Sequence, residues 1–280
     1  MRVCPRRQGA CADREIQRVT HFKDLRVMPI SNGIGRSFVA QHHYAVICPP
    51  ITKLTLGLFL AGELVGVALW GYGTRPKHTI KKLFPSFDVE DYLELNRLCV
   101  LDSMPRNTES LFLRMIAAHI RKHLLKIRVL FSWADGLRGK PGYVYQASNW
   151  LYGGSIWSQF YITDAGEVIH PRLLITRYGT RKRAVTLALG LKKVHGYQFR
   201  YCKFLCSHRE RKRLLKESTV NWSQTYPKKK DLKWVIDAEE GSRESRELPK
   251  LQGSGRFRHS APPLTKGVLH GMRGLQDRLG

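Results

Sequence analysis

Apolar and polar positions fall into blocks along the chain, and these blocks predict a mixed α/β domain. Leu54 to Trp70 is an apolar stretch divided by Ala61-Gly62-Glu63, which predicts a β-hairpin. Tyr92 to Leu101 and Ile127 to Trp133 have the length and the composition of strands. Between them, Glu109 to Leu125 repeats apolar residues at helical spacing, so we expect a helix that packs on the sheet.

The flanking segments extend this order. Val27 to Val46 indicates a strand, a turn and a short helix, and Tyr143 to Tyr152 indicates another short helix. Further strands are expected near Ser155 to Thr163, Val168 to Ile175 and Tyr197 to Cys206. This order resembles the GCN5-related N-acetyltransferase (GNAT) fold. The resemblance implies a central mixed sheet flanked by helices, in which two strands separate and an acyl donor enters the gap.

Composition divides the chain into a core and basic ends. We expect a basic flexible lead at 1–20, an acyltransferase-like catalytic domain at 21–206 and a basic, aromatic extension at 207–237 that binds nucleic acid. Residues 238–280 are rich in Ser, Gly, Pro and charge, which predicts disorder. The expected fold class is therefore mixed α/β with a basic C-terminal extension.

The charge balance points to a polyanionic partner. The chain has 48 Lys and Arg against 22 Asp and Glu, a formal net charge of +26, which favours nucleic acid. A generally basic soluble surface, or a ribosome-associated protein, is the alternative. The six cysteines include no CxxC pair, which favours a reduced compartment, and neither a signal peptide nor a membrane anchor is expected.

Candidate chemistry concentrates at the end of the strand Ile127 to Trp133. This strand delivers Ser132 and Asp135 to its carboxyl end, where crevices form in open α/β sheets. Asp135 is the preferred acid or base, and capping of the next helix is its alternative role. Arg97 lies within an apolar strand, so it must face a cavity or pair with Glu94 or Asp102.

The predicted helix after this junction carries a second set of candidates. Three residues would share one of its faces at spacings that suit a flipped base, namely Tyr145, Asn149 and Tyr152. Asn149 and Gln146 have amides that can contact the N6/N7 edge of adenine. Core packing of the tyrosines is the alternative.

Four segments, in order, resemble the bacteriophage Mom-type DNA-modification proteins. They are His42-His43-Tyr44, ELNRLCV at Glu94 to Val100, SWAD followed by GYVYQASNWLYGG, and ITRYGT at Ile175 to Thr180. The resemblance implies a transferase that converts the N6 amine of adenine in DNA to an acetamido-type derivative, which protects phage DNA from restriction in the bacterial cytoplasm. A coenzyme A-dependent N-acetyltransferase of proteins or small amines, and a non-catalytic nucleic-acid-binding protein, are the alternatives.

Roles are assigned on this basis. The catalytic candidates are Asp135, Tyr145, Arg97, Ser132 and Tyr44, and Tyr145 is in position to protonate a leaving group. The substrate-binding candidates are Asn149, Gln146, Tyr152, Arg106, Arg177 and Tyr178. His43 either orients substrate or joins Asp135 as a ligand of an iron ion (Fe2+), which the resemblance implies.

The donor is left open by the sequence. The turn SMPRNTES, Ser103 to Ser110, lacks the glycines of acetyl-coenzyme A enzymes, although Arg106 and nearby amides are suited to an anion. A coenzyme A thioester and an aminoacyl-tRNA are both candidate donors, so tRNA joins DNA as an expected partner. The oligomeric state is also open, with a dimer among the options.

Three basic runs are expected to grip the DNA backbone. They are Arg181, Lys182 and Arg183; Arg209, Arg211, Lys212 and Arg213; and Lys228, Lys229 and Lys230. Trp222, Tyr226 and Trp234 are interleaved with the last two runs and are expected to stack on an unpaired base.

Overall fold

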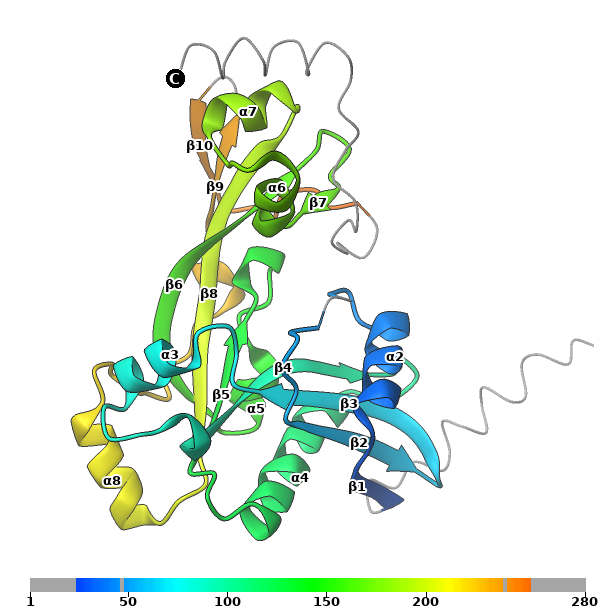
Figure 1. The fold of residues 1–280 in the computed structure, drawn as a ribbon, viewed down its shortest axis with the longest axis vertical. Coiled ribbons are helices and arrows are strands. Elements are labelled where there is room, and N and C mark those ends of the chain that lie inside the picture. The colour runs from blue at the N-terminus through cyan, green and yellow to red at the C-terminus, as the bar shows by residue number, and fades with distance from the viewer. Residues whose placement is uncertain (1–23, 46–47, 239–240, 253–280) are drawn as a thin grey trace, which may run out of the picture.

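The computed structural model describes residues 24–45, 48–238 and 241–252, and all structural statements refer to these residues (Figure 1). Ten strands form one mixed sheet in the order β1-β2-β3-β4-β5-β8-β6-β7, and β9 pairs with both β8 and β10. The strands are β1 Leu25–Pro29, β2 Leu54–Leu60, β3 Glu63–Gly71, β4 Tyr92–Val100, β5 Val129–Ala134, β6 Leu151–Ile162, β7 Val168–Ile169, β8 Lys192–Phe204, β9 Trp234–Ala238 and β10 Gly241–Ser245. The helices are α2 Asn32–His42, α3 Pro76–Leu83, α4 Thr108–His123, α5 Tyr143–Ala147, α6 Pro171–Tyr178, α7 Arg183–Ala188 and α8 His208–Glu217, with a 3₁₀ turn, η3, at Gly136–Arg138.

The mixed α/β fold predicted from the sequence is confirmed. The hairpin β2–β3 turns at Ala61 and Gly62, whose φ angles of 50° and 89° match the positive-φ turn that suits twisted hairpins. The buried side of α4 includes Phe112 and Ile116, which pack against apolar residues of the sheet. Strands β4 and β5, on either side of α4 in the chain, run parallel.

The parallel pair separates soon after it forms. Only three positions are paired, ending at Glu94 opposite Phe131, although β4 continues to Val100 and β5 to Ala134. A β-bulge in β4 lies just beyond, because Leu69 pairs with Arg97 and Trp70 with Leu95. Bulges bend a strand and increase its twist. The carboxyl ends of β4 and β5 therefore open into a gap.

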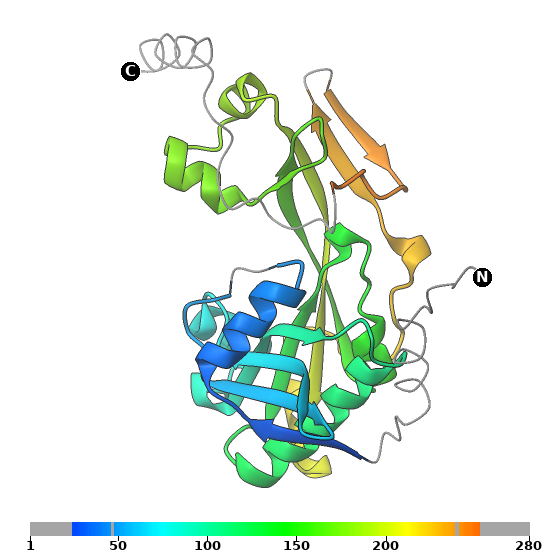
Figure 2. The same cartoon turned by 90° about the vertical axis from the view of Figure 1, so that its right-hand side faces the viewer.

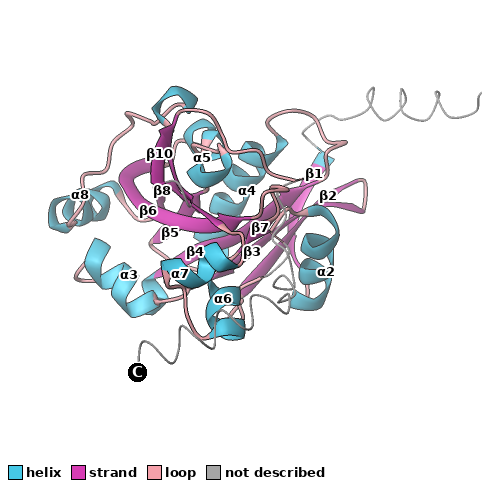
Figure 3. Cartoon of the chain, turned by 90° about the horizontal axis from the view of Figure 1, so that it is seen from above, coloured by secondary structure: helices cyan, strands magenta, loops and turns pink. Residues whose placement is uncertain are grey.

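Helices cover both faces of the sheet around this gap (Figures 2 and 3). Helix α4 packs on one face, against a large apolar cluster that includes Trp70 and Leu130. Helices α3 and α8 supply Ile80 and Leu214 to a second cluster around Phe131, and α2 belongs to a third. No helix in the described part of the chain is long and apolar enough to cross a membrane.

Strands β6 and β8 extend well beyond the other strands, as an arm that carries a second lobe (Figure 1). They pair along most of their length, from Leu151 opposite Cys202 to Ile162 opposite Lys192. The second lobe contains β7, α6, α7 and the β9–β10 hairpin, and it has a small apolar cluster of its own around Leu174.

Two predicted elements are wrong. The strand expected at Val168 to Ile175 ends after two residues, because Pro171 begins α6 and His170 caps that helix by accepting from Arg172 N at 3.1 Å. The helix expected at Tyr143 to Tyr152 ends at Ala147.

The ends of the chain also differ from expectation. Residues 207–237 are part of the main sheet and its helices, since α8 packs on the core and β9 pairs with β8. Strand β10 lies within the tail expected to be disordered. The lead at 1–20 and the rest of that tail, 253–280, lie outside the described residues.

Replacing Gly136 by alanine should destabilise the junction between η3 and β8. The added Cβ would lie 2.5 Å from Phe199 Cε2 and 2.6 Å from the backbone oxygen of Tyr197, which cannot rotate away. We expect a loss of about 1–3 kcal/mol in the free energy of unfolding, measured by urea denaturation. The matched control is Gly33→Ala in α2, where the nearest atom is 3.9 Å away, and it should be neutral or stabilising. Equal stability of both variants would contradict the tight packing at Gly136.

Candidate active site at the diverging strands

Asp135 lies at the end of β5, beside the gap. Its backbone oxygen accepts from the amides of Arg138 and Lys140, both at 3.1 Å, which closes a tight turn around the side chain. Carboxylate Oδ2 lies 3.3 Å from Arg138 Nε, while Oδ1 is buried with no hydrogen-bond partner in the described structure. Burial raises the pKa of Asp135, and the charges of Arg138 and Lys140 oppose that rise. The carboxyl group is a proton acceptor whose second oxygen is held ready for a partner.

The segment after α2 brings Tyr44 to Asp135. The Arg138 guanidinium lies 5.0 Å and the Lys140 ammonium 4.1 Å from the centre of the Tyr44 ring, distances typical of cation–π contacts. Burial and the charge of Asp135 raise the pKa of Tyr44, so its phenol keeps its proton. The His43 ring stacks on the Tyr44 ring at 4.4 Å.

Arg97 fixes this segment from β4. Its Nε donates to Ala45 O at 2.9 Å and its Nη1 to Asn96 O at 2.5 Å, rather than pairing with Glu94 or Asp102. The sequence left both arrangements open. Arg97 thus ties the bulged part of β4 to the loop that carries His43 and Tyr44.

Ser132 and Tyr145 form a second buried pair. Their hydroxyl oxygens are 2.8 Å apart, and Tyr145 stacks on Tyr201 at 5.0 Å. Burial raises the pKa of Tyr145 to about 12, so this phenol is protonated at neutral pH. The structure therefore brings Ser132 and Tyr145 together on the α4 side of β5, a contact that the sequence did not predict.

The residues expected to share one helix face do not do so. The helix ends before Asn149, which has a φ of 56°, and Tyr152 is already in β6. The Gln146 amide donates to Tyr201 Oη and to Pro227 O, both at 3.0 Å. Gln146 therefore holds neighbouring segments together instead of presenting its amide to a base.

Other predicted binding residues are dispersed. Arg106 is exposed in the turn before α4, whereas Arg177 and Tyr178 end α6 in the second lobe. The predicted basic runs lie in three places, at the start of α7, on α8 and beside α5, where Lys228 Nζ donates to Gln146 Oε1 at 3.1 Å.

The aromatic residues expected to stack on a base are used in packing. Trp222 stacks on Phe84 at 5.8 Å, and Tyr226 Oη donates to Trp150 O at 2.8 Å. Trp234 is buried and its Nε1 donates to Leu137 O at 2.9 Å. These three rings are therefore not a stacking surface for an unpaired base.

Two polar residues of β4 were missed as site candidates. Glu94 is the last residue paired with β5, and burial raises its pKa to about 7. Asn96 lies in the bulge, with its Oδ1 buried and without a described hydrogen-bond partner. The signal in the sequence was a pair of polar residues spaced two apart within an apolar strand, next to Arg97.

The residues around Asp135 do not fit an iron ion. No group of three His, Cys, Asp or Glu side chains in the described residues could hold a metal. His43 Nδ1 already lies 3.0 Å from Ala45 N, and three cations surround the single carboxylate. The iron ligation expected of His43 and Asp135 therefore lacks support.

The turn before α4 is a poor cradle for a diphosphate. The Thr108 amide is already bonded to Pro105 O at 3.2 Å, and Glu109 adds a negative charge to the first turn of the helix. Asn107 replaces the glycine that such a turn would favour and has a φ of 71°.

A parallel β4–α4–β5 unit, with strands that separate beyond a bulge, defines a GCN5-related acyltransferase-like fold. A model of the Mom protein family matches residues 24–228, and the chain belongs to that family. A methylcarbamoylase named Mom, from Escherichia phage Mu, is 36% identical over 209 residues, which are 74% of this chain and 85% of that protein.

Solved structures with remote similarity are acetyltransferases. A GNAT family acetyltransferase from Elizabethkingia anophelis with acetyl-CoA bound is 8% identical, with a TM-score of 0.36 over 65% of this chain and 98% of that chain. An IAA acetyltransferase from Bacillus cereus is 12% identical, with a TM-score of 0.37 over 64% and 99% of the two chains.

The position of His43 predicts a specific pH dependence. Burial and the charge of Arg97 lower its pKa from 6.5 to about 4, so the folded state binds this proton less readily than the unfolded state. Its contribution to stability is therefore present above pH 6.5 and is lost as the pH falls towards 4.

The free energy of unfolding should fall between pH 7 and pH 4.5. We expect this fall to be about 1–3 kcal/mol smaller in His43→Gln than in wild type, measured by urea denaturation at both pH values. The control His78→Gln changes an exposed histidine of α3 and should leave the difference between the two pH values unaltered. An unchanged pH difference in His43→Gln would show that His43 is not held neutral.

Proposed function

We propose that the protein modifies the N6 amine of adenine in DNA, transferring an acetamido-type group or its methylcarbamoyl isomer. The single observation that carries the proposal is the Asp135 carboxyl, which lies at the gap with a raised pKa and a buried oxygen without a described partner. Membership of the Mom family and the methylcarbamoylase name of the phage Mu relative support the chemistry. The net charge of +26 supports a polyanionic substrate.

Asp135 acts as the general base. The lone pair of adenine N6 is delocalised into the ring, so attack on an electrophilic carbon needs removal of an N6 proton as the new bond forms. A carboxylate with a raised pKa accepts that proton readily. Arg138 and Lys140 stay close enough to stabilise the negative charge of the carboxylate before the transfer.

Tyr145 supplies a proton to the leaving group. Its pKa of about 12 keeps the phenol protonated, and Ser132, at 2.8 Å, can donate a hydrogen bond to the phenolate that the proton transfer leaves. Tyr44, whose ring lies near Arg138 and Lys140 and whose pKa is raised by burial and by the charge of Asp135, is suited to position the adenine ring.

DNA contact on α8 is supported by two cations that are not neutralised. Glu210 accepts from Arg128 at 2.8 Å, and Glu217 accepts from Arg213 at 3.5 Å, so the acids of α8 already have partners. Arg209 and Lys212 are exposed on the same helix and have no described ion pair. A helix with this balance suits phosphate contacts, which position DNA without reading its sequence.

The test of the reaction is mass spectrometry of nucleosides from plasmid DNA of cells that express the protein. Wild type should yield a deoxyadenosine of increased mass, and fragmentation separates the acetamido from the methylcarbamoyl isomer. Asp135→Asn should reduce this product by roughly 10²–10⁴-fold, because general base catalysis is lost. The control Asp164→Asn changes an exposed surface carboxylate in an ion pair with Lys192 and should retain the product. Unmodified DNA from folded wild-type protein would refute the proposed function.

Arg209→Gln should weaken binding to duplex DNA. It should also lower the slope of log Kd against log salt concentration by about 0.9, because one phosphate contact is lost. Fluorescence anisotropy between low and moderate salt measures both quantities. The matched control is Arg26→Gln on β1, at the opposite edge of the sheet from α8 (Figure 1). Equal salt slopes for the two variants would exclude α8 from the DNA contact.

A further inference from the structure

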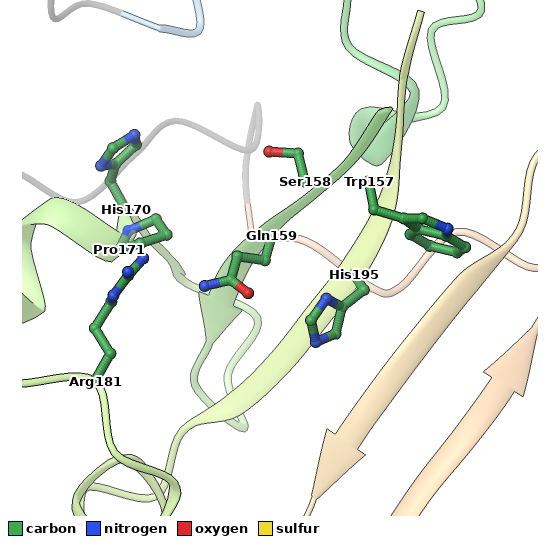
Figure 4. A pocket seen from close by; sticks show the side chains of 7 residues that line it. All are labelled: Trp157, Ser158, Gln159, His170, Pro171, Arg181 and His195. Atoms are coloured by element: carbon green, nitrogen blue, oxygen red, sulfur yellow. The ribbon is translucent and has the colours of Figure 1, made fainter. Parts of the chain in front are cut away.

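A pocket of about 490 Å³ lies on the arm (Figure 4), and Asp135 is not among the residues that line it. Strand β6 contributes Trp157 and Gln159, β8 contributes His195, and His170 and Arg181 come from the start of α6 and the loop before α7. The volume falls in the range of small-molecule and cofactor sites, roughly 300–1,000 Å³.

The lining of this pocket is suited to an anion. None of the residues that line it is acidic, and the nearby carboxylate of Asp237 is engaged by His195 Nε2 at 3.3 Å. Arg181 is exposed at the opposite wall, and it has no ion pair with any described carboxylate. A guanidinium in such a place is a good phosphate ligand.

Trp157 gives the pocket an aromatic rim. This side chain is 47% exposed. Its ring is supported by Tyr197 at 4.5 Å, and Lys233 Nζ lies 5.7 Å from the ring centre. An exposed indole held in place beside a cation is the arrangement that stacks unpaired bases in single-strand binding proteins.

We infer that this pocket binds a nucleoside phosphate, with the base on the Trp157 ring, the base edge at the Gln159 amide and the phosphate at Arg181. An amide side chain offers both a donor and an acceptor to a base edge. Two sources supply this chemistry, an unpaired nucleotide of the DNA strand being modified and a nucleotide carried by the group donor. The inference rests on the proposed action on DNA.

The pocket is connected to the Asp135 site through β6. Phe160 follows Gln159 in β6, so its buried ring lies on the other face of the strand, where the Arg138 guanidinium is 5.9 Å away. The pocket and the turn that carries Asp135 therefore both contact strand β6.

The experiment measures how tightly the full chain binds two probes at one salt concentration. Anisotropy is used for a labelled oligothymidylate, and calorimetry for free adenosine 3′,5′-bisphosphate. Trp157→Ala should weaken binding of one or both probes by about 5- to 100-fold, and Trp157→Phe should retain most of it. Loss confined to the oligonucleotide assigns the pocket to the DNA strand, and loss confined to the bisphosphate assigns it to the donor.

Arg181→Gln should weaken binding of the same probe. The control is Lys192→Gln, which removes an equal charge from the first residue of β8, outside the pocket. Wild-type affinity of Trp157→Ala for both probes overturns the inference, and so does an equal loss in Arg181→Gln and Lys192→Gln. The mass-spectrometric assay separates this result from the proposed function. If DNA is modified but Trp157→Ala binds both probes like wild type, only the inference about the pocket is refuted. If DNA is not modified but Trp157→Ala still weakens probe binding, only the proposed reaction is refuted.

Discussion

The separation of β4 from β5 is the constraint on which the rest of the site depends. Two parallel strands that stayed paired to their ends would close the sheet where Asp135 now lies. The bulge around Asn96 bends β4 away, and Arg97 then reaches the backbone of Ala45 from the bent strand. The cost is a buried polar oxygen on Asn96 without a described partner, an imperfection that is common where structure serves chemistry.

The charges around Asp135 are balanced rather than simply paired. The carboxylate pairs with Arg138, and the Arg138 and Lys140 cations also lie 5.0 Å and 4.1 Å from the centre of the Tyr44 ring. Burial favours the neutral carboxyl and the two cations favour the carboxylate, so neither effect acts alone. Such opposition keeps a group ready to exchange a proton, whereas a fully satisfied ion pair would hold it ionised.

Local patterns in the sequence predicted the hairpin, the β4–α4–β5 unit and the long strands, because period and turn chemistry are properties of neighbouring residues. These patterns gave the wrong element where a single residue determined the local backbone conformation. Pro171 started a helix within an apolar stretch, and Asn149 ended one. The approach of Tyr44 to Asp135 was suggested by family resemblance alone. The pocket on the arm was invisible, since His170, Arg181 and His195 meet only after the chain has folded.

The bond from Trp234 Nε1 to Leu137 O joins the late strand β9 to the turn that carries Asp135. Gln146, next to Tyr145, is likewise held by the carbonyl of Pro227. These ties make the order of synthesis matter. During synthesis, β4 and β5 leave the ribosome early. The turn that carries Asp135 can form its hydrogen bond with Trp234 only after Trp234 has also left the ribosome. The site is therefore completed only when nearly the whole chain has been made.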